Sequence, residues 1–311
     1  TQGAASIGKV VLIGDHKQLP AVVQQTEEEA SVTDEGLRTI GLTDCRLSLF
    51  ERLLSRFRTA DGYDPRFVYM LTRQGRMHSQ IADFPSLAFY SHKLQPVPLP
   101  HQTAPLQTTT STHGIARMLT THRLAFVCSE RPTQIASPKT NDVEARMIAS
   151  IAYQAYLLCG ENFDTEQSIG IIVPYRNQIS AIRNAIDQYG ISELHNISID
   201  TVERFQGSQR DYIIYGFTIQ QRWQLNFLSS NTFMEEGAWI DRKLNVAMTR
   251  ARLQLTLVGN PQLLAHNTTF SQLMQYSRSQ GAFLQVDTER FCRGDFEVQS
   301  RPDGLSAAQE E

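Results

Sequence analysis

Residues 169–190 read IGIIVPYRNQISAIRNAIDQYG, and this stretch decides the fold class. Its first five residues are almost all β-branched and apolar, which is typical of a strand buried on both faces of a sheet. Ile179, Ile182 and Ile186 then recur at helical spacing up to Gly190, a residue type that favours the end of a helix. A buried strand followed directly by an amphipathic helix predicts one unit of a parallel α/β sheet.

The same alternation of strands and helices continues on both sides of this unit. Asn141 and Glu144 have the spacing of a capping box at the start of a long helix that would end near Gly160. Short apolar runs that predict further strands lie at residues 9–14, 67–71, 124–128, 197–200, 212–217 and 253–258. We therefore expect an α/β protein with a mostly parallel sheet and helices on both faces.

The composition fits a folded protein of about two domains. Of the 311 residues, 41% are hydrophobic and 20% are charged, which excludes global disorder. Lys and Arg number 29 against 32 Asp and Glu, a net charge of −3, so the whole chain has no basic footprint. The four cysteines are far apart, which predicts neither a zinc framework nor disulfides and favours the reducing cytoplasm. No apolar run approaches the ~18–20 residues of a membrane span.

Breaker-rich residues 59–65 divide the chain. We expect a first part at residues 1–66, a main domain at 67–285 and a C-terminal tail without sustained periodicity at 286–311. Ser48 and Glu51 predict a capped helix in the first part, whereas four prolines and a Ser/Thr run make residues 95–114 a surface loop. The chain opens at Thr1, a few residues before a strand too hydrophobic to lie outside a sheet, so we interpret it as a fragment.

Polar clusters follow several of the predicted strands, where an open parallel sheet binds its ligands. The first cluster, residues 14–20, displays Asp15 and Gln18 directly after the strand at 9–14. A glutamine at this position can orient a water molecule or sense a phosphate, because its amide both donates and accepts hydrogen bonds. An ordinary polar turn has the same composition, so this cluster alone does not decide the function.

Three later clusters carry groups that suit phosphate. At residues 71–78, Arg73 and Arg76 stand at a strand end, and guanidinium groups bind phosphate oxygens in a bidentate manner. At residues 198–211, Thr201 and Gly207 offer a hydroxyl and a main-chain amide to a nucleotide or a nucleic-acid backbone. At residues 243–252, Arg250 follows a helix, where it would stabilise charge on a transferring phosphate. A solvated basic turn at residues 71–78 and an ordinary surface arginine pair at residues 243–252 remain the alternatives for these two clusters taken singly.

The order of the motifs is more specific than any one of them. GDHKQLP at 14–20, QGRMH at 74–78, VPYRNQ at 173–178, FQGSQRD at 205–211 and LNVAMTRAR at 244–252 resemble the later motifs of superfamily 1 helicases. The resemblance is strongest to the branch that holds the nonsense-mediated-decay helicase and the replication nuclease-helicases. It covers residues 9–259 and implies the tail of a first RecA-like domain followed by a complete second one.

The resemblance assigns roles at an ATP site. It implies that Gln18 is the γ-phosphate sensor, in a loop that Asp15 supports. Arg76 and Arg250 would clamp the γ-phosphate from the second domain, with Arg250 as the arginine finger. The remaining nucleotide-binding positions that it implies are Gln74, Gly207 and Gln209.

The resemblance also implies a nucleic-acid track and a set of partners. Thr201 and the turn of Pro174 and Tyr175 would contact the backbone of a single strand. The partners would be single-stranded DNA or RNA and an N-terminal RecA-like domain of the same protein, with ATP and Mg²⁺ as cofactors. The residues themselves do not choose between DNA and RNA, since phosphate contacts and stacking serve both.

Three departures from the family pattern bear on activity. The Walker A string G-x-x-x-x-G-K-[S/T] and an Asp-Glu pair before residue 9 are both absent, so the magnesium ligands are expected outside this chain. Gly75 stands where the family has an adenine-stacking tyrosine, and Gln209 stands where it commonly has glutamate. We expect the longer protein to be an ATP-dependent helicase and this chain alone to be inactive.

Two other interpretations remain open from the sequence. A degenerate RecA-like module would bind nucleic acid or a partner protein without turnover, and Gly75 and Gln209 favour this weakly, while Gln18, Arg76 and Arg250 count against it. A dinucleotide-dependent oxidoreductase would require G-x-G-x-x-G after a first strand, and the sequence contains no such string.

Overall fold

The computed structural model of the chain describes residues 8–60 and 62–299. They belong to two compact units, residues 1–71 and residues 72–311. The division falls a few residues beyond the boundary that the sequence predicts after residue 66. The predictions for the first residue, Thr1, and for the last part of the tail, residues 300–311, concern residues outside the described ones.

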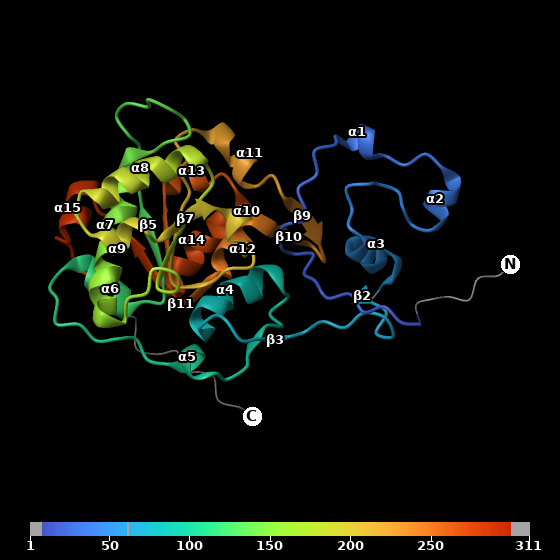
Figure 1. Cartoon of the computed structure of the whole chain (residues 1–311), viewed down its shortest axis with the longest axis horizontal. Coiled ribbons are helices and arrows are strands. Elements are labelled where there is room, and N and C mark those ends of the chain that lie inside the picture. Colours follow the sequence, from blue (N-terminus) through green and yellow to red (C-terminus); the bar gives the residue numbers. More distant parts are fainter. Residues whose placement is uncertain (1–7, 61, 300–311) are drawn as a thin grey trace. The chain divides into compact units, whose positions relative to one another are not determined.

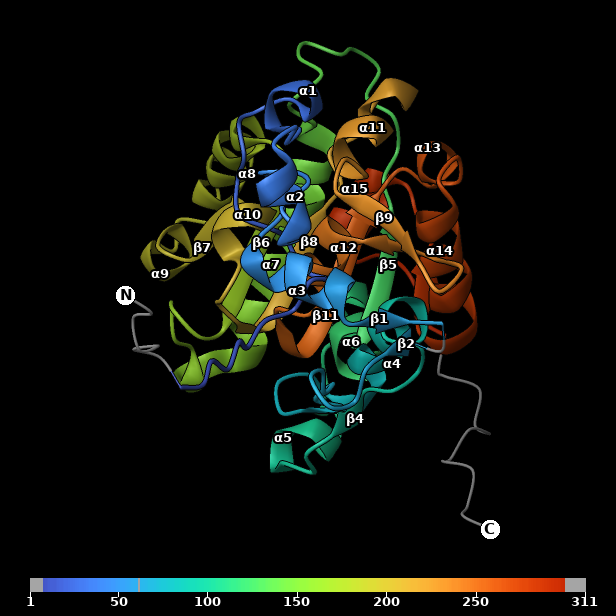
Figure 2. The ribbon, with the colours of Figure 1, turned by 90° about the vertical axis from the view of Figure 1, so that its right-hand side faces the viewer.

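The second unit is built on a six-stranded sheet in which all neighbouring strands are parallel. Across the sheet the strands are β12 (Ala282–Leu284), β5 (Leu124–Cys128), β11 (Ala251–Gly259), β8 (Arg210–Gly216), β6 (Ile169–Val173) and β7 (Ser198–Thr201). In Figure 2 the labels of β7, β6, β8, β11 and β5 follow this order from left to right. Every residue of β5 and β6 is buried, as the apolar runs predict for strands covered on both faces.

Helices cover both faces of this sheet, which confirms the predicted α/β fold (Figure 1). One group, whose members contact one another, consists of α6 (Gly114–Thr121), α7 (Asp142–Cys159), α8 (Arg176–Asp187), α9 (Ser192–His195) and α15 (Thr288–Arg293). The other group consists of α4 (Ser79–Phe89), α12 (Arg242–Met248) and α14 (Thr268–Gln280). No helix among the described residues has the length and apolar character needed to cross a membrane.

Short elements complete the second unit. They are β3 (Arg73–Gln74), β4 (Gln95–Pro96), α5 (Pro100–Thr103), η1 (Gly160–Asn162), α10 (Val202–Phe205), η2 (Arg222–Gln224), α11 (Leu225–Leu228), β9 (Thr232–Glu235), β10 (Ala238–Asp241) and α13 (Pro261–Leu264). The sheet brings the ends of its parallel strands to one edge, where Val173 pairs with Thr201 and Gly259 pairs with Cys128. Polar segments that are distant in sequence therefore emerge side by side.

The start of α7 differs from the predicted capping box. Asn141 caps the helix as expected, because its side chain accepts a hydrogen bond from the Glu144 amide at 3.1 Å. The Glu144 carboxylate does not return to the cap. It is fully buried, accepts hydrogen bonds from the Ser129 hydroxyl at 3.1 Å and the Thr218 amide at 2.7 Å, and thereby joins the ends of β5 and β8.

The first unit contains α1 (Glu27–Ala30), α2 (Glu35–Thr39), α3 (Leu49–Arg56), β1 (Arg58–Thr59) and β2 (Gly62–Tyr63). The capping box at Ser48 and Glu51 is present at the start of α3. The strands predicted at residues 9–14 and 67–71 are wrong for this structure, and Ile13 is 87% exposed and Tyr69 85% exposed. A strand needs hydrogen-bonded neighbours, and neither stretch pairs with another strand among the described residues.

Two segments are more ordered than the sequence predicts. Residues 95–104 form β4 and α5, and Gln102 is completely buried, so this part of the expected surface loop belongs to the folded unit. In the predicted tail, α15 forms and buries Phe291, and Val298 is also buried. Both corrections have the same cause, because the burying surfaces come from distant parts of the chain and leave no local periodicity.

Candidate functional site

The turn that carries Arg76 is held by the side chain that precedes it. The Gln74 amide oxygen accepts hydrogen bonds from the main-chain N–H of Arg76 at 3.0 Å and of Met77 at 2.8 Å. The Gln74 amide nitrogen donates to the Met77 carbonyl at 2.9 Å. This side chain, which the resemblance assigns to the nucleotide, therefore shapes the arginine turn between β3 and α4.

A second glutamine fixes the same turn from outside. Gln102 donates to the main-chain carbonyls of Gln74 at 2.8 Å and Met77 at 3.0 Å, and its oxygen accepts from the amides of Val97 and Leu99. His101 Nε2 lies 3.0 Å from the carbonyl oxygen of Arg76. Sequence reasoning missed both residues, since a glutamine in a proline-rich loop gives no local sign of burial.

The Arg76 guanidinium joins three of the motifs. Its Nε donates to the Gln209 side-chain oxygen at 3.0 Å, and its Nη1 donates to the Thr249 carbonyl at 2.9 Å. Burial lowers the pKa of Arg76, yet an arginine remains charged at any ordinary pH. Within the described part of the chain, Nη2 of Arg76 forms no hydrogen bond. The two bonds from Nε and Nη1 fix the orientation of the guanidinium, and the N–H groups of Nη2 can donate to a ligand.

Arg250 lies in the turn between α12 and β11 and is only 2% exposed. Its Nε donates to the Val246 carbonyl at 3.0 Å, its Nη1 to the Ser208 carbonyl at 3.4 Å and its Nη2 to the Thr249 hydroxyl at 3.2 Å. Arg250 is thus not the solvated surface arginine that the sequence of this cluster alone allows. The structure instead buries the guanidinium against the loop that contains Gly207.

Gly207 and Gly75 differ in whether the backbone conformation requires a glycine. Gly207 has φ +88°, a conformation that favours glycine, and nothing lies within 4 Å of where a Cβ would be. The loop is therefore open to the close approach of a ligand. Gly75 has no such backbone, and a Cβ there would make an ordinary contact of 3.4 Å with Leu99. The position accepts a side chain, so backbone strain does not explain this glycine.

The predicted nucleic-acid residues meet at the carboxyl edge of the sheet but are all buried. Pro174 and Tyr175 follow β6, and Thr201 ends the neighbouring β7. The Tyr175 ring stacks on Phe227 with centroids 4.9 Å apart, and burial raises the pKa of its hydroxyl. The exposed side chains of this motif are those of Arg176 and Asn177, in the first turn of α8.

In the first unit, the loop of Gln18 is held by Asp15. The Asp15 carboxylate accepts hydrogen bonds from the Gln18 side-chain amide and from the Lys17 main-chain amide, each at 3.0 Å. The main-chain N–H of Gln18 also donates to the main-chain carbonyl of Asp15 at 3.2 Å. These three bonds span three residues or fewer, so each of them is local in the sequence.

Comparison with known proteins identifies the family of the chain. A family model described as an AAA domain matches residues 45–262. This chain belongs to that family. The match contains the arginine turn, the Gly207 loop and the Arg250 turn, but begins beyond the loop of Gln18.

Curated relatives of this AAA domain are helicases. The chain is 30% identical over 91% of its length to a protein of Dictyostelium discoideum described as a probable helicase, and 30% identical over 91% to the ATP-dependent helicase NAM7 of Saccharomyces cerevisiae. It is 31% identical over 82% to the DNA polymerase alpha-associated DNA helicase A of the same yeast. The chain is thus a superfamily 1 helicase region with a RecA-like fold. It spans 25%, 26% and 35% of the lengths of these three relatives.

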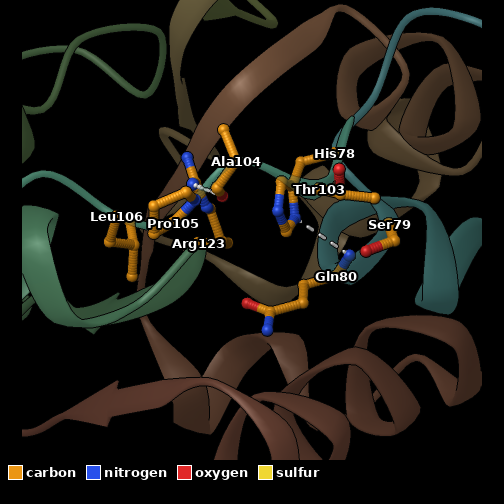
Figure 3. A pocket seen from close by; sticks show the side chains of 8 residues that line it. All are labelled: His78, Ser79, Gln80, Thr103, Ala104, Pro105, Leu106 and Arg123. Carbon is orange, nitrogen blue, oxygen red and sulfur yellow. Dashed lines mark hydrogen bonds between the residues drawn. The ribbon is translucent and has the colours of Figure 1, made fainter. Parts of the chain in front are cut away.

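A cavity of about 290 Å³ lies at the start of α4 in this AAA domain (Figure 3). It is lined by His78, Gln80, Thr103 and Arg123, among others. Arg123 donates to the carbonyls of Leu253 at 3.0 Å and Ala104 at 2.6 Å, and burial together with this cation lowers the pKa of His78 to about 4. His78 is therefore neutral near pH 7, and the cation of the cavity is bound to main-chain oxygens.

The residues of the arginine turn and the Gly207 loop fit the phosphate groups of a nucleotide, but they do not fit the metal ion that a nucleotide carries. The Arg76 guanidinium and the open glycine loop are suited to phosphate oxygens, whereas the Arg250 guanidinium is buried and bonded to protein oxygens. In the stretch that the structure describes, no group of three His, Cys, Asp or Glu side chains is placed to hold a metal ion.

Proposed function

We propose that this chain is part of the ATP-driven motor of a superfamily 1 helicase that moves on single-stranded DNA or RNA. Arg76 and Arg250 stabilise the γ-phosphate, Gly207 approaches the nucleotide, and Gln18 is the phosphate sensor of its own loop. Residues 1–66 are the tail of a first RecA-like domain and residues 67–285 are the second. ATP, Mg²⁺ and the remaining first domain complete the motor, and the reducing cytoplasm suits the four free cysteines.

The contact of Arg76 with both Gln209 and Thr249 carries this proposal. These bonds span 133 and 173 positions of the sequence and bring together three segments that the resemblance assigns to one nucleotide site. An ordinary surface arginine has no such fixed partners. The supporting comparison is the ATP-dependent helicase NAM7, whose name states the use of ATP.

The two cations have different tasks. Arg76 presents the free edge of a fixed guanidinium, which suits charge that develops on the oxygens of a transferring phosphoryl group. Arg250 is bound to the Ser208 carbonyl, so it sets the position of the loop after Gly207 as well as the local charge. Gln209 accepts from Arg76 as a glutamate would, but without a charge it leaves the cation unneutralised for the phosphate.

The main test removes Arg76 in the longer protein that the proposal implies. Arg76→Ala is expected to lower kcat for ATP hydrolysis by ~10³-fold or more with little effect on the nucleotide Kd, because the cation acts on charge in the transition state. Arg76→Lys is expected to rescue poorly, since a point charge lacks the planar fork. Arg252→Ala is the matched control, because Arg252 pairs with Asp211 at 2.7 Å in the same region. Hydrolysis near the wild-type rate in Arg76→Ala would contradict the proposal.

A second test uses the chain alone. We expect no hydrolysis that depends on magnesium and a single strand, because the sequence has neither the Walker A lysine nor the paired carboxylates. Phosphate release at rates typical of motors would refute the assignment of those groups to another part of the protein. An inactive longer protein that still binds a single strand would instead support the degenerate binding module.

A further inference from the structure

The segment between β8 and α12 carries an exposed aromatic side chain that the helicase motifs do not use. It contains η2, α11 and the hairpin of β9 and β10. Both tryptophans of the chain lie here, Trp223 in η2 with 54% exposure and Trp239 in β10 with 50% exposure. Tryptophan is enriched at binding surfaces because it combines a large apolar ring with one N–H donor, so each tryptophan is a candidate contact.

Trp223 borders a cavity. The cavity has a volume of about 460 Å³ and lies between η2, α11 and the start of α14. Its polar lining includes Arg222, Asn226, His266 and Asn267, and it contains no carboxylate. The lining therefore combines one cation with neutral amides and an indole ring. It does not repel an anion, and the indole offers a flat apolar surface.

The indole is held in place while its ring remains uncovered. Trp223 Nε1 donates to the Gln221 side-chain oxygen at 2.6 Å, which satisfies its only polar atom. No aromatic ring or cation of the described chain stacks on Trp223. Next to it, Gln224 is fully buried, accepts from the amides of Gln220 and Gln221 and donates to the Pro138 carbonyl at 2.6 Å. The helical turn is therefore preorganised.

The same segment is attached to the turn that follows β6. The Gln224 amide lies 3.4 Å from the Tyr175 hydroxyl oxygen, to which it donates. Phe227 stacks on the Tyr175 ring, and Lys243 Nζ lies 4.0 Å from the centroid of Phe227. The cavity therefore lies next to the carboxyl edge of the sheet. Buried at this edge are the residues proposed to contact nucleic acid, Pro174, Tyr175 and Thr201.

We propose that Trp223 is a base-stacking platform for single-stranded nucleic acid, with Arg222 contacting an adjacent phosphate. The inference rests on the proposed function and names a contact beyond its motifs. Every base has a flat π-face, so stacking on the indole accepts any sequence, while the phosphate contact supplies charge. The buried motif residues position the segment, and the exposed indole makes the contact with the base.

The test uses the two tryptophans as matched reporters in the whole chain. In the Trp239→Phe variant the only indole is Trp223, and short oligo(dT) or oligo(rU) strands are expected to quench its fluorescence on stacking. In the Trp223→Phe variant the only indole is Trp239, and its emission is expected to stay constant. Quenching by either or both strands supports the proposal and identifies the nucleic acid that is bound.

Affinity provides the second measurement. Fluorescence anisotropy of a labelled strand is expected to show that Trp223→Ala weakens binding roughly 5- to 150-fold, the range for loss of one base stack. Trp239→Ala is expected to leave binding unchanged, and the exposure of both rings allows both variants to fold. Binding that is insensitive to Trp223→Ala, with no quenching of Trp223, overturns this inference and leaves the proposed function standing. Failure of the unmodified chain to bind any strand overturns the strand-binding role of the chain together with the inference.

Discussion

The first and second units use similar apolar sequences to opposite effect. Residues 10–13 and residues 169–173 are both runs of β-branched and aliphatic side chains. In the second unit Ile171 is completely buried in β6, with parallel neighbours on both sides, whereas in the first unit Ile13 is 87% exposed in a stretch without strand pairing. The comparison teaches that an apolar run specifies a strand only where other strands supply its hydrogen bonds and its covering faces.

The candidate functional groups follow the same division. Asp15 and Gln18 bind each other across three residues of an exposed loop. Arg76, Gln102 and Arg250 are held by partners far away in the sequence, several of them main-chain carbonyls. The bonds named for the second set join distant segments of the folded unit, whereas the bond between Asp15 and Gln18 is local.

The largest expected effect compares two isoleucines. Ile171→Ala removes a buried side chain from the central sheet and is expected to lower the free energy of unfolding by about 2–5 kcal/mol. Ile13→Ala is expected to change it by less than ~0.5 kcal/mol, because that side chain is exposed. Urea denaturation of the whole chain measures both variants. Equal losses would break the comparison, since Ile13 would then be as buried as Ile171.

An intermediate effect is expected for two glutamines. Gln102→Ala removes four hydrogen bonds around the Arg76 turn and is expected to cost about 1–3 kcal/mol, because main-chain groups lose their partners in a buried place. Gln18→Ala removes a local hydrogen bond to the solvent-exposed Asp15 and is expected to cost less than Gln102→Ala. Thermal unfolding compares the two. A neutral Gln102→Ala variant would show that the turn is formed without this clamp.

The smallest expected change is in the pH dependence of stability. Burial raises the pKa of Glu144 from 4.5 to about 8. The stabilisation of the folded state by the protonated carboxyl is therefore fully present below pH 4.5 and is lost as the pH rises toward 8. Between pH 6 and 7 the loss of this stabilisation lowers the free energy of unfolding by at most ~1.4 kcal/mol. Glu144→Gln is expected to reduce this slope, and Asp241, whose pKa burial raises to about 6, accounts for part of what remains.

The control for Glu144 lies in the first unit. The Thr26 main-chain amide donates to Glu29 and lowers the pKa of that carboxyl, so its stabilising effect is lost only as the pH falls below 4.5. Glu29→Gln is therefore expected to leave the slope between pH 6 and 7 unchanged. Unfolding curves at a series of pH values provide the measurement, and a wild-type slope in Glu144→Gln would argue against burial of an uncharged carboxyl.

Local rules predicted what depends on local sequence. The caps at Asn141 and Ser48 are present, and Gly160 ends α7 with φ +52° as its position indicates. The same rules failed for the Glu144 side chain, which has the spacing of a capping partner but is drawn into the core by the ends of β5 and β8. A spacing of three residues does not reveal a competing partner that lies 74 residues away.

The sequence by itself determined the α/β sheet of the second unit, because the periodicity of buried strands and amphipathic helices is written in neighbouring residues. It also determined the family, because the motifs follow one another in order. Only the tertiary structure decided that residues 10–13 are exposed, that Gln102 holds the Arg76 turn and that Tyr175 is buried beneath Phe227. The physical reason is that burial and hydrogen bonding between distant segments depend on which surfaces the folded chain brings together.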